Sequence, residues 1–499
     1  MIMMLRDMFF NRLIAELAAL GTLKRMCKDG AELLMVLLIF SFGFAFNLWI
    51  FSRNWLITGI DGPYYLIQVR ELLRRGSLVY GAPPLAFLLL SFFCLITGDL
   101  MLGVKVGVSL LCALSTVPAF YLMRRAGKSS LPGFIAMTLI IFSAPYIRMM
   151  TDFMKNAIGI LFLLSFLYYL HVLATSGFSR RSLILANFFL ILTGLTHILD
   201  FGVAILFLML YSLWAVILNV NRHPFLKSTC IIALVLFLFI LMASTFFGDL
   251  FADFGKALSF LRELAGMGGA GRPPPRPSLK PKPQAPSPPL WIRAVGGWEY
   301  VLLLLFSGAI LTVYSWLRGD GESTLLLSAV TSMSSMISFP LIPPNWLWRL
   351  MLMIVVPTAI IFSQGLSEVN RLMKRTGGNP LSEASTALII ISLAFFIMQA
   401  GYAAEKARPT ISYEGYLDLV EMKDKIPPDS LVVADFHVAY WVEYVDEVAV
   451  ERATPEIWRT HQHVLGVFFK NRPPPFPFRV IYRGRVFVLV ELQPRIPRH

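Results

Sequence analysis

Charged residues are scarce in this chain of 499 residues: only 15% are Asp, Glu, Lys or Arg, whereas 57% are hydrophobic. A soluble globular domain usually has about 25% charged and about 45–50% apolar residues. The shortage of charge therefore excludes an ordinary soluble enzyme and a disordered chain. It indicates a membrane protein with many spans.

Cysteine is also rare, and the four cysteines form neither a CxxC pair nor a Cys/His pair at the spacing of a zinc site. The sequence lacks the Walker, GxSxG and HExxH motifs of nucleotide-binding proteins, serine hydrolases and zinc proteases. No basic patch with interleaved aromatic residues points to nucleic acid. The polar residues that border the apolar segments are therefore the candidates for chemistry.

Eleven apolar runs are long enough, or nearly so, to cross about 30 Å of hydrocarbon. A further segment, Leu85–Gly98, follows two prolines and would reach only about 20 Å as a helix, so we expect it to lie at the membrane surface or to dip into it. The eleven runs are Leu33–Phe51, Leu102–Met123, Leu131–Tyr146, Ala157–Leu173, Leu183–Leu199, Phe201–Leu218, Thr229–Phe247, Tyr300–Leu317, Thr324–Phe339, Leu347–Phe362 and Thr386–Tyr402.

The placement of basic residues predicts the orientation. Residues 405–499 carry no net charge, so the whole excess of +14 lies in residues 1–404. If Leu85–Gly98 does not cross the membrane, every short basic loop falls on one side, as the positive-inside rule requires. If it does cross, the next three clusters change sides. The clusters predicted to be cytoplasmic are Arg124, Arg125 and Lys128; Arg180 and Arg181; Arg222 and Lys227; Arg318; and Arg371, Lys374 and Arg375.

These patterns predict a mostly α polytopic membrane protein with about eleven transmembrane helices, additional surface helices and a small C-terminal α/β domain outside the cytoplasm. Residues 1–30 predict a cytoplasmic interfacial helix, residues 31–404 the transmembrane domain, and residues 405–499 the soluble domain. The predicted external loops are 52–101, 146–156 and 248–298. Arg272–Pro289, with nine prolines, predicts an extended spacer; a flexible lid over a polar-headed ligand is the alternative.

The soluble domain has a mixed pattern. Tyr413–Lys425 reads as an amphipathic helix that ends before two prolines, and Ser430–Ala434 and Val448–Val450 read as buried strands. Residues 479–491 predict a hairpin around an Arg-Gly turn.

Asp61 is the first candidate for chemistry, in Gly59–Tyr65, a few residues after the first apolar run. A carboxylate just outside the hydrocarbon, beside Tyr64 and Tyr65, is well placed to act as a general base. Asp followed by Gly-Pro also suits the start of a helix, and the two roles are compatible.

Two further segments carry charge at a membrane border. Arg148, Asp152 and Lys155 share one face if their segment is helical, which fits either a salt-bridge cluster or a phosphate site. Arg349 lies just inside a late apolar run with no acidic residue nearby in sequence. It either reaches back to the headgroups or captures a lipid phosphate.

Weaker signals come from single polar residues. A lone histidine such as His197, near Asp200, is more often a hydrogen-bonded core residue than a functional one. Glu263 opens the third external loop with Asp249 and Asp253, and each is a candidate ligand for a metal or an acceptor. For Asp435 and His437 we favour structural roles.

Taken together, Gly59–Tyr65, the short surface helix after it, a basic inner loop and Tyr146–Asp152 resemble the GT-C superfamily of polyprenyl-phosphate-dependent glycosyltransferases, in particular the catalytic subunit of oligosaccharyltransferase in its membrane part. The resemblance implies that Asp61 and Asp152 are catalytic. It also implies that Arg148 matches the arginine before the second acid, and that Arg349 matches the arginine that binds the lipid-linked phosphate.

The sequence departs from that enzyme in two places. Oligosaccharyltransferases have a second acid at the second motif, whereas here Asp152 is followed by Lys155 and Asn156. The requirement for a metal, Mg or Mn held by Asp61 and Asp152, is therefore left open. The acceptor motif Trp-Trp-Asp-Tyr-Gly is absent, since the corresponding stretch reads Ala434–Val438. A member that transfers a monosaccharide fits better.

The predicted function is transfer of a sugar from a polyprenyl- or dolichyl-phosphate donor to an acceptor hydroxyl, by an inverting displacement on the extracytoplasmic face. The acceptor is a glycan, a lipid or a protein. Asp61 would remove the acceptor proton, and Arg349, Arg148 and Lys155 would hold the phosphate, so we expect these groups and Asp152 to meet in one cavity. The alternatives are an oligosaccharyltransferase acting on protein Asn, a transporter or flippase of lipid-linked or polar substrates, and a structural scaffold.

Overall fold

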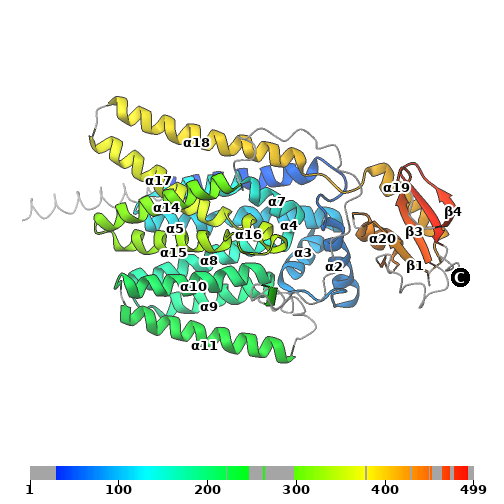
Figure 1. Cartoon of the computed structure of the whole chain (residues 1–499), viewed down its shortest axis with the longest axis horizontal. Coiled ribbons are helices and arrows are strands. Elements are labelled where there is room, and N and C mark those ends of the chain that lie inside the picture. The colour runs from blue at the N-terminus through cyan, green and yellow to red at the C-terminus, as the bar shows by residue number, and fades with distance from the viewer. Residues whose placement is uncertain are drawn as a thin grey trace, which may run out of the picture.

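The computed structural model describes residues 30–220, 222–246, 262–263, 297–376, 379–427, 430–435, 437–448, 450–451, 464–472 and 477–492. Long helices run side by side up to residue 406, and a small sheet domain lies at one end of them (Figure 1). The predicted interfacial helix, Arg272–Pro289, Asp249 and Asp253 lie outside the described residues.

Each of the eleven apolar runs lies on a helix or on two consecutive helices, because an apolar segment in lipid must satisfy its own backbone hydrogen bonds. A first helix, Gly30–Ser52, precedes the others. The helices that follow it in the membrane part are α2 (Gly62–Arg75), α3 (Leu85–Thr97), α4 (Leu100–Leu114), α5 (Thr116–Ala126), α6 (Ser130–Ile141), α7 (Ala144–Asp152), α8 (Met154–Ser176), α9 (Arg180–Thr196), α10 (Ile198–Ile217), α11 (Arg222–Phe246), α14 (Trp298–Leu317), α15 (Gly321–Ile337), α16 (Pro344–Leu352), α17 (Val355–Thr376) and α18 (Asn379–Lys406).

Seven helical stretches of the described chain are long and apolar enough to cross a membrane, or eight if α6 and α7, which meet at a bend of 48°, form one broken span. The chain is therefore a multi-pass membrane protein, and the total of eleven spans stays a prediction. Helix α3 has only 13 residues and is too short to count as a span, which agrees with the expectation for Leu85–Gly98.

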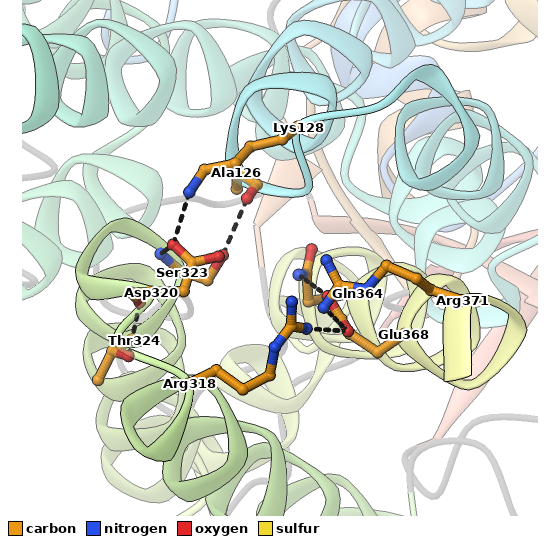
Figure 2. Close-up of polar contacts among 9 residues, drawn as sticks. All are labelled: Ala126, Lys128, Arg318, Asp320, Ser323, Thr324, Gln364, Glu368 and Arg371. Carbon is orange, nitrogen blue, oxygen red and sulfur yellow. Dashed lines mark hydrogen bonds and ion pairs between the residues drawn. The ribbon is translucent and has the colours of Figure 1, made fainter. Parts of the chain in front are cut away.

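Loops with predicted cytoplasmic charge meet at the end of the helices that lies away from the sheet domain (Figure 1). There the buried carboxylate of Glu368 on α17 accepts hydrogen bonds from Arg318, at 2.8 Å, and from Arg371, and Lys128 pairs with Asp320 at 3.0 Å (Figure 2). These contacts tie the ends of α5, α14 and α17 together, so the basic loops share one face.

The C-terminal domain has a five-stranded sheet in the order β2-β1-β3-β5-β4. Strand β1 pairs in parallel with β2 and β3, whereas β3 and β4 both pair antiparallel with β5. The predicted helix, first strand and hairpin are present, but β3 and α20 had no clear sequence signal. The elements are α19 (Tyr413–Met422), the 3-10 turn η1 (Lys423–Lys425), β1 (Leu431–Ala434), α20 (Ala439–Asp446), β2 (Val450–Glu451), β3 (Val464–Phe469), β4 (Phe478–Arg483) and β5 (Phe487–Leu492).

Helix α20 attaches this domain to the membrane part by packing on α2. Arg70 of α2 donates to the carbonyl oxygen of Tyr444 at 2.6 Å, and Arg74 pairs with Glu447 at 3.4 Å. These polar links hold α20 against α2, the helix that begins directly after Asp61.

Candidate active site

The segment around Asp61 is held between two distant parts of the chain. The N–H of Gly59 donates to the carbonyl oxygen of Arg408 at 3.1 Å, and the N–H of Ile60 donates to Oδ1 of Asp152 at 3.4 Å. Asp61 is the next residue. The structure therefore brings two acids about ninety positions apart to neighbouring places.

Gly59 allows this close approach. Its φ of +86° lies in the region that favours glycine, and a Cβ on it would stand 1.9 Å from the carbonyl oxygen of Thr151. No side chain fits between the two backbones.

We expect Gly59→Ala to destabilise the protein by about 1–3 kcal/mol more than Gly76→Ala, because a methyl group at residue 59 must displace backbone. Gly76 is the matched control: its φ of +69° is also positive, but a Cβ there meets nothing within 4 Å. Thermal unfolding in detergent measures the difference. Equal unfolding temperatures for the two variants would show that the contact with Thr151 does not hold the segment.

Asp61 stands at the N-cap position of α2, with Pro63 following, but its side chain makes no capping hydrogen bond. Instead it lines a cavity of about 470 Å³ together with Lys155, Arg349 and His197. This volume is in the usual range for a small-molecule site. Of the two roles that the sequence allowed, the structure gives Asp61 the helix-start position, and the residue also lines the cavity, as a general base would have to.

Arg349 and Lys155 bring positive charge to this cavity from two helices. Arg349, on α16, has its guanidinium 5.9 Å from the ring centroid of Phe153 and 5.4 Å from that of Trp348. Lys155 is the second residue of α8, and its backbone N–H donates a hydrogen bond to the Tyr65 hydroxyl oxygen at 3.1 Å. Two cations beside one carboxylate favour an anionic ligand.

Tyrosines close the side of the cavity that faces the C-terminal domain. Tyr64 of α2 and Tyr440 of α20 are 5.5 Å apart between ring centroids, and Tyr80 contacts both. The Tyr80 hydroxyl donates to Glu443. Burial and this bond raise the pKa of Tyr80 above its usual range, so the hydroxyl stays protonated. The soluble domain thus contributes a wall of the Asp61 cavity.

Asp152 and Arg148 line a second cavity, of about 820 Å³, next to the first. Oδ2 of Asp152 lies 3.7 Å from Nε of Arg148. Both cavities reach Leu352, and the contact between Phe153 and Trp348, at 5.3 Å between ring centroids, lies between them. We expected one cavity for all five groups, and the structure has two adjacent ones, because α7 ends at Asp152 and the chain turns at Phe153 before α8 begins.

Of the weaker candidates, two lie at the Asp61 cavity and two lie in the soluble domain. His197 lines the Asp61 cavity, and Glu263 accepts a hydrogen bond from the indole N–H of Trp346, another lining residue, at 3.3 Å. Oδ1 of Asp435 accepts the N–H of His437 at 3.0 Å, a local turn contact that fits the structural role we favoured.

Sequence reasoning did not assign the polar residues Tyr80, Asn156 and Tyr440 to this cavity. The other lining residues that it did not assign are Gly81, Phe153, Ile198, Leu199, Trp346 and Leu352. Asn156 directly follows Lys155, and that adjacency was a usable signal. Tyr80 and Tyr440 had no local signal, since they meet only because α20 docks on α2.

The residues present do not fit the Mg or Mn site left open above. Within the described ranges, no three or more His, Cys, Asp or Glu side chains gather where a metal ion could be held. Asp61 and Asp152 line different cavities, and both oxygens of Asp152 have partners in Ile60 and Arg148. We therefore derive no chemical step through a metal.

No protein family and no curated protein match the chain in sequence. Solved structures do match it. The apo oligosaccharyltransferase of Archaeoglobus fulgidus is 13% identical over 83% of this chain, with a TM-score of 0.55. The same archaeal enzyme, AglB, in complex with an inhibitory peptide and a dolichol-phosphate is 14% identical over 83% of the chain, with a TM-score of 0.54. ArnT from Cupriavidus metallidurans is 11% identical over 91% of this chain and 97% of its own, with a TM-score of 0.47.

The alignment covers only 64% of the oligosaccharyltransferase chain in either match. The chain therefore shares the fold of these oligosaccharyltransferase structures, as the resemblance to the GT-C superfamily implied.

Proposed function

We propose that this protein transfers a sugar from a polyprenyl-phosphate donor to an acceptor hydroxyl, in the Asp61 cavity. One observation carries the proposal: Asp61, Lys155 and Arg349 line a single cavity where the membrane helices meet the soluble domain. A lipid-linked sugar phosphate has its charged group at that level, with its tail among the helices. The basic loops at the opposite end favour an extracytoplasmic position for the cavity.

The two cations would hold the phosphate of the donor. A guanidinium binds phosphate with two parallel hydrogen bonds, and Lys155 adds a second positive charge. They stabilise the charge that grows on the phosphate as its bond to the sugar breaks. Arg148, which the sequence suggested as a third phosphate ligand, lines the neighbouring cavity instead and is not part of this phosphate site.

Asp61 would act as the general base. It removes the proton of the acceptor hydroxyl as the hydroxyl oxygen attacks the anomeric carbon from the side opposite to the phosphate. One displacement of this kind inverts the configuration at the anomeric carbon.

Asp152 would act by positioning Asp61. Its Oδ1 accepts the Ile60 N–H, directly before Asp61, and Arg148 pairs with its other oxygen. The pair fixes the segment that presents Asp61, and the adjacent cavity leaves room for part of the acceptor.

The structural neighbours support this class of donor. One of them was solved with a dolichol-phosphate and an inhibitory peptide. This chain lacks the Trp-Trp-Asp-Tyr-Gly motif at Ala434–Val438. For that reason we prefer a monosaccharide donor to a lipid-linked oligosaccharide.

The test is transfer by purified protein in detergent from a panel of radiolabelled polyprenyl-phosphate monosaccharides to glycan, lipid and peptide acceptors. We expect product with at least one monosaccharide donor. Transfer of a whole oligosaccharide to an Asn-containing peptide would instead identify an oligosaccharyltransferase. Binding of donors with no transfer to any acceptor would favour a transporter or flippase.

A further inference from the structure

A histidine and a buried aspartate form a pair at the Asp61 cavity that the mechanism above does not use. His197 lies between α9 and α10 and lines the cavity. Its Nδ1 lies 3.1 Å from Oδ2 of Asp200, in the first turn of α10, and Asp200 is fully buried. The contact fixes the direction of the imidazole ring.

Two residues of helix α8, Asn156 and Gly159, lie against the Asp200 carboxylate. With its amide nitrogen facing this carboxylate, Asn156 donates to Oδ2 at 3.0 Å and to Oδ1 at 2.7 Å. A Cβ at Gly159, one turn further, would stand 2.2 Å from Oδ2, so only glycine leaves room. The two hydrogen bonds from Asn156 and the space left by Gly159 together accommodate the Asp200 carboxylate.

A fully buried carboxylate is costly unless it is paired with a positive charge. His197 contacts Asp200 directly, and the charge of Lys155 also acts on this carboxyl group, so these two side chains are the candidates for its positive partner. An imidazolium whose Nδ1–H is directed at Asp200 carries a second N–H, on Nε2, and His197 lines the cavity.

Other charged groups also face this ring. Within the described chain, the cavity lining holds Asp61 from α2, Lys155 from α8 and Arg349 from α16, and its tyrosines are Tyr64, Tyr65, Tyr80 and Tyr440. Glu263 and Glu443 contact lining residues. The charged residues of α9, Arg180 and Arg181, lie in its first turn. Those of α11, Arg222 and Lys227, and the titratable His223 lie in its first two turns. Both groups are at the helix starts, away from His197.

We propose that His197, oriented by Asp200, is a third group that holds the phosphate of the lipid-linked donor. This inference rests on the proposed function. As the bond between the anomeric carbon and the phosphate oxygen breaks, its electron pair goes to that oxygen, and the His197 N–H hydrogen-bonds to the phosphate. The acceptor proton goes to Asp61, so His197 keeps its own. His197 is then a catalytic residue, and Asp200 is a positioning residue.

The experiment measures two quantities across neutral and alkaline pH: the rate of transfer, and the binding of a short-chain polyprenyl phosphate. The variants are His197→Gln, His197→Lys and Asp200→Asn. Asp320→Asn is the matched control, because Asp320 also starts a helix and pairs with a cation, Lys128, but at the opposite end of the helices. Size-exclusion profiles and unfolding temperatures show which variants are folded.

We expect His197→Gln to lower kcat and weaken phosphate binding by about 10–100-fold, the value of one hydrogen bond to a charged group. Wild-type activity should fall as rising pH removes the imidazole proton. His197→Gln should lack this fall, His197→Lys should move it to higher pH, and Asp200→Asn should move it to lower pH. Asp320→Asn should match the wild type.

Two results would overturn the inference: a wild-type pH profile in folded His197→Gln, or polyprenyl phosphate binding that does not depend on His197. The proposed function fails separately. If the wild type binds polyprenyl phosphate through His197 but transfers no sugar, the phosphate site stands and glycosyl transfer does not.

Discussion

Asp61→Asn should lower the rate constant of sugar transfer by about 10²–10⁴-fold, the usual contribution of a general base. Asn has the size of Asp but cannot take a proton, and the Asp61 side chain makes no capping hydrogen bond that the change would alter. The affinity for the donor should therefore change little, because the phosphate is held by Arg349 and Lys155. Single-turnover kinetics with saturating donor separate the two effects.

Asp99→Asn is the control for this substitution. Asp99 also stands at a helix N-cap, where Oδ1 accepts the Leu102 N–H at 2.6 Å, and Asn preserves such a cap. Similar rates in the two variants would remove Asp61 from the chemistry.

Arg349→Gln should raise the Kd of the donor by about 10–100-fold, since it removes charged hydrogen bonds to the phosphate. Arg349→Lys should recover part of the loss, because it restores the charge but not the two-pronged geometry. Equilibrium binding of a labelled donor measures both variants.

Arg148→Gln separates the two cavities. Arg148 has the same side chain as Arg349 but lines the cavity of Asp152, so its loss should leave the Kd of the donor almost unchanged. If Arg148→Gln weakens donor binding more than Arg349→Gln does, the donor lies in the second cavity and the assignment of the phosphate site is wrong.

The fold was largely predictable because lipid imposes a simple rule. Apolar runs form helices, and basic loops share one face, so the helix positions and the common end of Arg318 and Lys128 followed from the sequence. Strand β3 escaped prediction because Val464–Phe469 is a short apolar run without alternation. Periodicity cannot distinguish such a run in a buried strand, which β3 is, from a buried helix segment.

The site was predictable only in part. The approach of Asp61 to Asp152 followed from the resemblance, but the division into two cavities did not, since it depends on the turn at Phe153 and on the ring of Trp348. The cluster of Tyr64, Tyr80 and Tyr440 at the cavity depends on how α20 docks on α2, a contact between residues more than 350 positions apart. No local pattern encodes such a contact.

The most direct test of the central claim is an experimental structure of the protein with a polyprenyl phosphate bound in a lipid nanodisc. Our account predicts that the phosphate lies in the cavity of Asp61, in contact with Arg349 and Lys155, with the polyprenyl chain leading away between membrane helices. A phosphate bound beside Arg148 and Asp152, or at the end of the helices that carries Arg318 and Glu368, would contradict it.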